Sequence, residues 1–181
     1  MVRSLHRTLV AGGVVAVVAA GGGVAVAGST PTLRATGPVA IAGTEASGVF
    51  TVADRTVRQI RYDDRGTLRY TFSLTNEGRL PVTVAGLEAG QTDPRLFDLV
   101  ELTSGELSSG ESGEFTLSLH MNGCESLSSR SGSFVSEVVV RTEQAGMFED
   151  TVTVSLPEEI HTGSPREAFC PESTATSRPQ G

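Results

Sequence analysis

The chain of 181 residues contains no tryptophan and only two tyrosines and two cysteines. It also contains no lysine, so its 14 strongly basic side chains are all arginines. Because aromatic residues make up only 5% of the sequence, we expect a core built mainly from valine and leucine. The formal net charge is −7 and no basic patch offsets it, so we expect no nucleic-acid partner.

The N-terminal segment, residues 1–27, has no acidic residue and the composition of a signal peptide. Its basic leader contains Arg3, His6 and Arg7, and an uncharged stretch follows from Leu9 to Val26. We therefore expect the rest of the chain to be secreted or to lie in the cell envelope. Because ATP and NAD chemistry belongs to the cytoplasm, neither cofactor is expected.

The end of this segment carries the small residues that a signal peptidase recognises. Ala25 and Ala27 occupy the two small positions, which predicts cleavage before Gly28. The uncharged stretch is also about as long as a bilayer span. The alternative is therefore an uncleaved signal anchor and a single-pass membrane protein with its body outside, which would touch the membrane only through this segment.

The remaining sequence divides into a linker, a body and a tail. Residues 28–48 are rich in Ala, Gly, Thr and Pro and predict a flexible linker. Residues 49–157 contain the strand-like patterns and form the expected folded domain. Residues 158–181 predict a C-terminal tail with a disordered end.

Apolar and polar side chains alternate along the body, which is the pattern of half-buried strands. The clearest segments are 68–75, 80–85, 115–121, 134–140 and 151–156, and the weaker ones are 49–52, 57–62 and 97–102. No segment after residue 30 has a helical period. We therefore expect an all-β fold of about seven antiparallel strands stacked as a sandwich, with a closed barrel as the alternative.

Local patterns predict further details of this sandwich. Residues 76–79 have the composition of a turn in which Gly78 takes a positive φ, so the first two clear strands should form a hairpin. Alternation predicts that Phe134, Val138 and Val140 share one face of their strand.

Three stretches carry a resemblance to a known family. They are TFSLTNEGRLPVTVAGL, LSSGESGEFTLSL, and GSFVSEVVVRTEQAG followed by TVTVSLP. Their order resembles the immunoglobulin-like domains of the hydin and abnormal-spindle type, which are related to major sperm protein, and the match spans roughly residues 69–156. The chain departs from that pattern in a Ser-Ser-Gly where Pro-Pro-Gly is usual and in a cysteine-bearing insertion. It is also similar to small exported proteins of high-GC Gram-positive bacteria.

This resemblance implies an immunoglobulin-like sandwich and a scaffolding or binding role. Such domains offer no catalytic residues to transfer to this sequence. We therefore expect a non-catalytic module that binds an unidentified protein or envelope component, or that acts as an envelope spacer.

Cys124 and Cys170 are the only cysteines, and both follow the signal segment. In an oxidising compartment an even number of cysteines predicts one disulfide, which would pin the tail to the body. Closing this loop of about 46 residues would stabilise the fold by ~4 kcal/mol through the lost entropy of the unfolded chain. Free thiols and an intermolecular bridge are the alternatives.

Side chains of the types that bind copper(I) are also present. They are His120, Met121, Cys124, His161 and Cys170. Alternation argues against a shared site, because neighbouring residues of a strand point to opposite faces. No metal site is therefore expected. Because the ligand types are present, an extracytoplasmic small-ligand or copper-binding carrier is kept as the alternative function.

Candidate catalytic groups are equally scattered. Residues 109–113 fall one position short of the G-x-S-x-G motif of serine hydrolases. The adjacent pairs Asp63–Asp64 and Glu158–Glu159 would point to opposite faces of a strand and are expected to be solvated turn residues. The sequence therefore predicts that the protein is not an enzyme.

We predict that non-reducing peptide mapping of the exported protein will find one cross-link, between Cys124 and Cys170. Replacing both cysteines by serine should lower the melting temperature by several degrees, because the unfolded chain regains entropy. The bond should be structural, since glutamates close to both cysteines in the sequence disfavour the reactive thiolate. Rapid alkylation of both thiols in native protein, with an unchanged melting temperature in the double variant, would contradict the cross-link.

Overall fold

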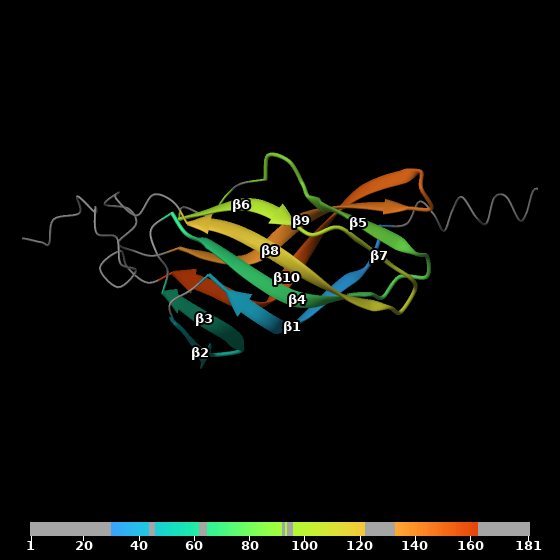
Figure 1. The fold of residues 1–181 in the computed structure, drawn as a ribbon. Coiled ribbons are helices and arrows are strands. Elements are labelled where there is room, and N and C mark those ends of the chain that lie inside the picture. Colours follow the sequence, from blue (N-terminus) through green and yellow to red (C-terminus); the bar gives the residue numbers. More distant parts are fainter. Residues whose placement is uncertain are drawn as a thin grey trace, which may run out of the picture.

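The computed structural model describes residues 30–43, 46–61, 65–91, 93, 96–121 and 133–162. This part of the chain contains strands and no helix (Figure 1). The ten strands are β1 (Leu33–Ala42), β2 (Ala46–Val52), β3 (Arg55–Arg61), β4 (Thr67–Asn76), β5 (Val82–Leu87), β6 (Phe97–Leu102), β7 (Gly105–Leu107), β8 (Ser112–Met121), β9 (Phe134–Gln144) and β10 (Phe148–Thr162). The expected signal segment and both cysteines lie outside the described residues.

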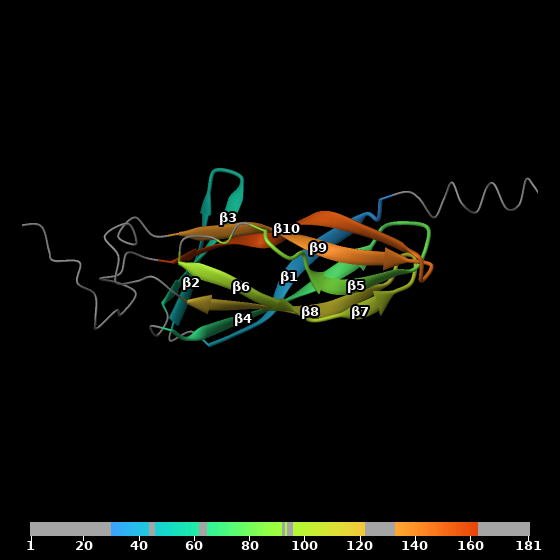
Figure 2. The ribbon, with the colours of Figure 1, turned by 90° about the horizontal axis from the view of Figure 1, so that it is seen from above.

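The strands form two sheets that lie on each other as two layers (Figure 2). One sheet has the order β1-β4-β8-β6, and the other has the order β2-β3-β10-β9-β5-β7. All neighbouring strands are antiparallel except β3 and β10, which run parallel. The expected all-β fold in two sheets is confirmed. The expected antiparallel pairing holds except between β3 and β10, and the described residues contain ten strands in place of about seven.

The strand β1 lies within residues 28–48, which the sequence predicted to be a flexible linker. That prediction is wrong for residues 33–42, which pair along β4. Leu33 and Ile41 of this strand pack against the core. The alternation of β1 is hidden because Gly37–Pro38 interrupts the strand and the register shifts at this point.

The hairpin predicted between residues 68–75 and 80–85 does not form. The strand β4 pairs with β1 and β8, whereas β5 pairs with β7 and β9 in the opposite sheet. Both strands bury alternate side chains in the same core from opposite sides, which produces the same sequence pattern as a hairpin. The alternation of apolar and polar residues thus indicates which face of a strand is buried, but it does not indicate which strand lies next to it in the sheet.

The side chain of Asn76 stabilises the segment in which the chain passes from β4 in one sheet to β5 in the other. Its fully buried side-chain amide donates hydrogen bonds to the carbonyls of Leu80, Leu107 and Ser108, at 2.8, 3.1 and 3.2 Å. Its Oδ1 accepts a bond of 2.9 Å from the N–H of Gly78. Gly78 does not take the predicted positive φ, and a Cβ there would stand only 2.9 Å from this same Oδ1. Close approach to Asn76 therefore favours glycine at position 78.

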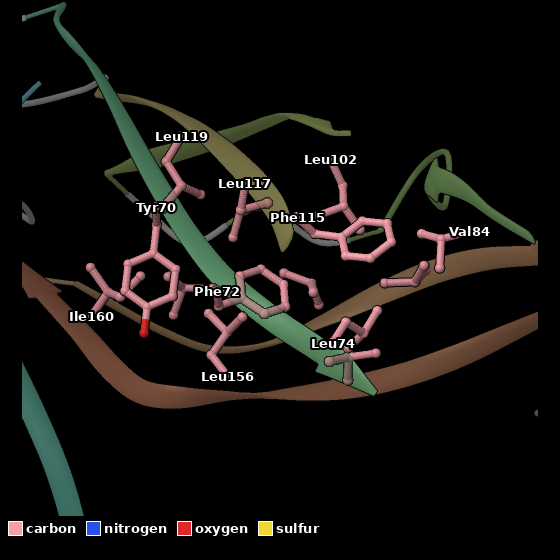
Figure 3. Close-up of a cluster of buried hydrophobic side chains, with 14 of the residues drawn as sticks. Tyr70, Phe72, Leu74, Val84, Leu102, Phe115, Leu117, Leu119, Leu156 and Ile160 are labelled. Atoms are coloured by element: carbon pink, nitrogen blue, oxygen red, sulfur yellow. The ribbon is translucent and has the colours of Figure 1, made fainter. Parts of the chain in front are cut away.

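The core fills the space between the two sheets (Figure 3). Alternate side chains of β4 and β8 are buried, as their sequence pattern predicts: Leu68, Tyr70, Phe72, Leu74, Phe115, Leu117, Leu119 and Met121. The opposite sheet contributes mainly valines, namely Val57, Val82, Val84, Val135, Val138, Val140, Val152 and Val154. The buried side chains are thus mostly aliphatic, as the shortage of aromatic residues requires.

One predicted core residue faces solvent. Phe134 is exposed, and Val135 is buried in its place with Val138 and Val140. The ladder between β9 and β10 shifts register between Ser155 and Ile160. At this irregularity the buried positions of β9 change from odd to even numbers, so that Val135 and Val138 are both buried. Counting back in steps of two from Val138 therefore places Phe134 on the wrong face.

We predict that Asn76→Ala will lower the free energy of unfolding by about 3 kcal/mol, because it leaves buried carbonyls without their donor. Urea unfolding of both proteins measures this loss. The matched control is Thr75→Ala, which removes the exposed hydroxyl contact with Ser112 and should cost less than about 1 kcal/mol. Equal losses in the two variants would contradict the assigned role of Asn76.

Candidate functional site

Two arginines of β3 meet two glutamates of β10 at the end of the sandwich where the described chain leaves it. Arg58 pairs with Glu158, and Arg55 pairs with Glu159. We call these four residues the arginine–glutamate cluster. It lies where β3 runs parallel to the last residues of β10. The cluster therefore connects the β2–β3 hairpin to the rest of its sheet.

Arg58 and Glu158 form a forked ion pair. Nε of Arg58 donates to Oε2 of Glu158 at 2.6 Å, and Nη2 donates to Oε1 at 3.0 Å. Both side chains are largely buried, with 14% and 6% of their surface exposed. Nη1 of Arg58 also donates to Oγ of Ser47 at 3.1 Å. The guanidinium thus ties β2, β3 and β10 together with the planar two-bond geometry that a lysine cannot supply.

The neighbouring carboxylate of Glu159 has different partners. Nη1 of Arg55 donates to its Oε2 at 2.8 Å, and Nε2 of His161 contacts its Oε1. The ring of His161 stacks on Phe134, with 5.3 Å between the ring centroids and 20° between their planes. Glu159 is itself buried. The exposed Phe134 and the buried Glu159 are therefore joined through His161.

These contacts correct the prediction that Glu158 and Glu159 are solvated turn residues. Both are buried, and both belong to β10, which extends to Thr162. The predicted boundary of the tail at residue 158 is therefore wrong for residues 158–162. Sequence patterns could not show this, because Glu158 is 100 residues away from the arginine that neutralises it.

Tyr70 reaches toward the cluster from the opposite sheet. Its side chain extends from β4 into the core with the hydroxyl pointing toward β10 (Figure 3). The residue is fully buried, and its hydroxyl lies close to the carboxylate of Glu158 but makes no hydrogen bond of good geometry with the described residues. Burial raises the pKa of Tyr70 well above its ordinary value; the negative charge of Glu158 raises it further, while Arg58 acts in the opposite direction. The hydroxyl therefore stays neutral.

The predicted copper ligands do not come together in the described structure. Met121 is fully buried in the core, whereas its neighbour His120 is half-buried on the outer face of β8. His161 lies on β10, in the other sheet. Cys124 and Cys170 lie outside the described residues. Among the residues that are described, no group of three or more His, Cys, Asp or Glu side chains could hold a metal ion.

Of the residues that approximate a hydrolase motif, 109–111 lie in the turn between β7 and β8, and Ser112 and Gly113 begin β8. Oγ of Ser109 donates to the carbonyl of Gly78 at 2.7 Å. The carboxylate of Glu111 accepts a bond of 2.8 Å from the N–H of Ser108, and this bond lowers the pKa of Glu111. Both side chains therefore stabilise the turn.

The β2–β3 hairpin exposes apolar side chains next to the arginine–glutamate cluster. The exposed fractions of Val49, Phe50 and Val52 are 51%, 45% and 44%. The strand β2 is the outermost of its sheet and stands at one side of the molecule (Figures 1 and 2). The sequence identified residues 49–52 as a weak strand, but alternation could not reveal that both faces of it are exposed.

We predict that Tyr70→Phe will raise the free energy of unfolding at neutral pH by about 1 kcal/mol, because it removes a buried hydroxyl that makes no hydrogen bond of good geometry with the described residues. The pKa of Tyr70 is higher in the folded protein than its unfolded value of about 10, so the native protein should lose stability as the pH rises above that value. The variant should lose less. Urea unfolding at neutral and alkaline pH measures both effects, and a destabilised variant at neutral pH would show that the hydroxyl has a favourable partner.

Comparison with known proteins assigns no relationship to this chain. No family model matches the sequence, and no curated protein matches it. The described residues also contain no helix of the length and apolarity that crossing a membrane requires. The role of the cluster and of the hairpin therefore has to be argued from their own chemistry.

Proposed function

We propose that the protein is an exported, non-catalytic immunoglobulin-like module that acts by binding and holds its binding surface away from the membrane side of the envelope. The observation that carries this proposal is the exposed apolar surface of the β2–β3 hairpin, formed by Val49, Phe50 and Val52. Apolar side chains gathered on an otherwise polar surface are typical of sites that bind other macromolecules.

The first and last described strands begin and end at opposite ends of the sandwich, which supports a spacer role. The first strand, β1, begins at Leu33, beside the C-terminal end of β4. The last described residue, Thr162, is hydrogen-bonded to Ser133 and lies at the other end of the sandwich (Figures 1 and 2). The ten residues of β4 span about 33 Å between these ends. A membrane-side N-terminal segment would therefore place the hairpin and the arginine–glutamate cluster on the distal end of the body.

The state of the polar side chains favours binding over catalysis. A general acid or base needs an accessible group whose pKa lies near the working pH. In the cluster, arginines neutralise Glu158 and Glu159, and Tyr70 is a neutral, buried phenol. These groups stabilise the distal end, so that the hairpin beside them is held as a rigid surface.

The chemistry of the surface indicates the class of partner. The net charge of −7 disfavours nucleic acid, because phosphates would be repelled. The apolar hairpin instead suits a protein surface or an apolar envelope component.

Export is tested with the full chain carrying an epitope after Gly181, expressed in a bacterial host. We expect a product whose mass begins at Gly28, found in the medium or the envelope, because a signal peptidase removes residues 1–27. Protease added to intact cells should destroy any cell-bound epitope. A membrane-bound product that retains Met1 would replace cleavage by anchoring, and a protease-protected cytoplasmic product would refute export.

The same preparation distinguishes binding from metal carriage. We expect purified protein to contain no stoichiometric copper. Stoichiometric copper that is lost in His120→Ala would refute the binding module and favour the carrier. The matched control is Ser118→Ala, which alters a side chain on the same outer face of β8 that is not of a copper-binding type.

A further inference from the structure

The two described sheets have four edge strands, and three of them carry features that prevent pairing with another strand. Open edges present unpaired backbone groups, and proteins block them with proline, charge, bulges or short length. In β1 there is Pro38 and a register shift, and in β6 there are Asp98, Glu101 and another shift. The third edge, β7, has only three residues and includes Glu106.

The fourth edge, β2, has none of these features. Its seven residues include no charged side chain and no proline. They pair with β3 residue by residue, from Ala46 opposite Arg61 to Val52 opposite Arg55, without a register shift. Alternate residues of such a strand turn their N–H and C=O groups away from the neighbouring strand. No other described strand covers this edge, which is therefore open to one more antiparallel strand.

Two of the three arginines beside this edge are already paired with carboxylates. Arg55 and Arg58 of β3 are paired with Glu159 and Glu158, so neither needs an acidic partner. An incoming strand therefore gains most if it is uncharged and apolar. The strand β2 itself has this composition, and identical uncharged strands do not repel each other.

We propose that β2 pairs antiparallel with β2 of a second copy of this chain, about a two-fold axis at Val49. This inference rests on the proposed binding function and names its partner. Val49 is the central residue of the strand, so an axis there aligns all seven residues of both copies. The register places Gly48 opposite Phe50, and Ser47 opposite Thr51, of the second copy.

Side-chain size supports this register. Of the described atoms, none lies within 4 Å of where a Cβ of Gly48 would stand, so the space over this residue is open. The exposed ring of Phe50 from the second copy would cover it, and aromatic side chains stabilise edge glycines in this way. On the other face, Ser47 and Thr51 form the hydroxyl pair that is common across strands. The two-fold axis makes each of these contacts twice.

The size of the contact predicts its strength. Stable interfaces bury about 1,600 Å² in total, and a single strand pair offers less than this. We therefore expect a weak dimer, whose population increases as the protein concentration is raised into the micromolar range. Anchoring or local concentration in the envelope would favour it further.

The test uses the axis itself. The full chain is expressed with export as wild type, Val49→Lys and Val49→Glu, and the products are compared by sedimentation velocity over a wide concentration range. The wild type should dimerise reversibly. Each variant alone should dimerise roughly tenfold or more weakly, because the axis brings two like charges together, and an equal mixture should recover a heterodimer.

The control is Val100→Lys, which adds the same charge at another exposed valine on an edge strand, β6; Val100 is 59% exposed and Val49 is 51% exposed. It should dimerise like the wild type. A monomeric wild type at every concentration, an undiminished Val49→Lys dimer, or loss of the dimer in Val100→Lys would each overturn the proposal. All three results would leave export of the module unaffected.

Hydrogen exchange of the wild type provides a second measurement, which applies even if a variant fails to fold. Alternate amides of β2 should become more protected as the concentration rises, while the amides of β6 should not change. Equal protection of β2 at low and high concentration would overturn the proposal.

Discussion

The buried ion pair between Arg58 and Glu158 helps to determine the position of the end of the sandwich that carries β2 and β3. The strand β3 joins its sheet through only four residue pairs with β10, which run parallel, and β2 touches the sheet only through β3. The forked pair adds two short hydrogen bonds to this limited ladder and a third contact to Ser47. Breaking a buried pair on one side costs about 3–5 kcal/mol, because the remaining charge loses its counterion. The orientation of the β2 edge thus depends on a charge interaction in addition to the packing of the buried Val57 and Ile60 of β3, whereas the rest of the sandwich depends mainly on apolar packing.

Periodic burial was predictable from the sequence, but the pairing of strands was not. In residues 68–74 of β4 and 115–121 of β8 every second side chain is apolar and buried, so the local pattern contained the necessary information. The choice of neighbour depends on contacts between distant segments, and therefore the crossing at Asn76 looked like a hairpin. The strand β1 was hidden for a related reason: it is an edge strand whose alternation is broken at Gly37–Pro38.

The candidate site was less predictable than the fold. Adjacent glutamates are usually solvated, and nothing near Glu158 and Glu159 in the sequence shows that arginines of β3 neutralise them. The orientation of His120 against Met121 was predicted correctly, because it requires only the two-residue period of a regular strand. β2 is exposed because it lies at the edge of its sheet. An apolar strand can have the same composition at the centre of a sheet or at its edge, so composition does not reveal this position. Sequence patterns therefore find strands more readily than they find open edges.

The parallel contact between β3 and β10 also has a consequence for the order of folding. The chain is synthesised from its N-terminus, and β10 is the last of the described strands to be made, yet it pairs with both β3 and β9 and lies against β1. The hairpin β2–β3 is complete early but cannot dock until a segment about 100 residues later arrives, which is a long loop to close. An apolar, uncharged edge is therefore left without its support during synthesis. Keeping the chain unfolded until its C-terminal part has emerged would protect that edge from premature pairing.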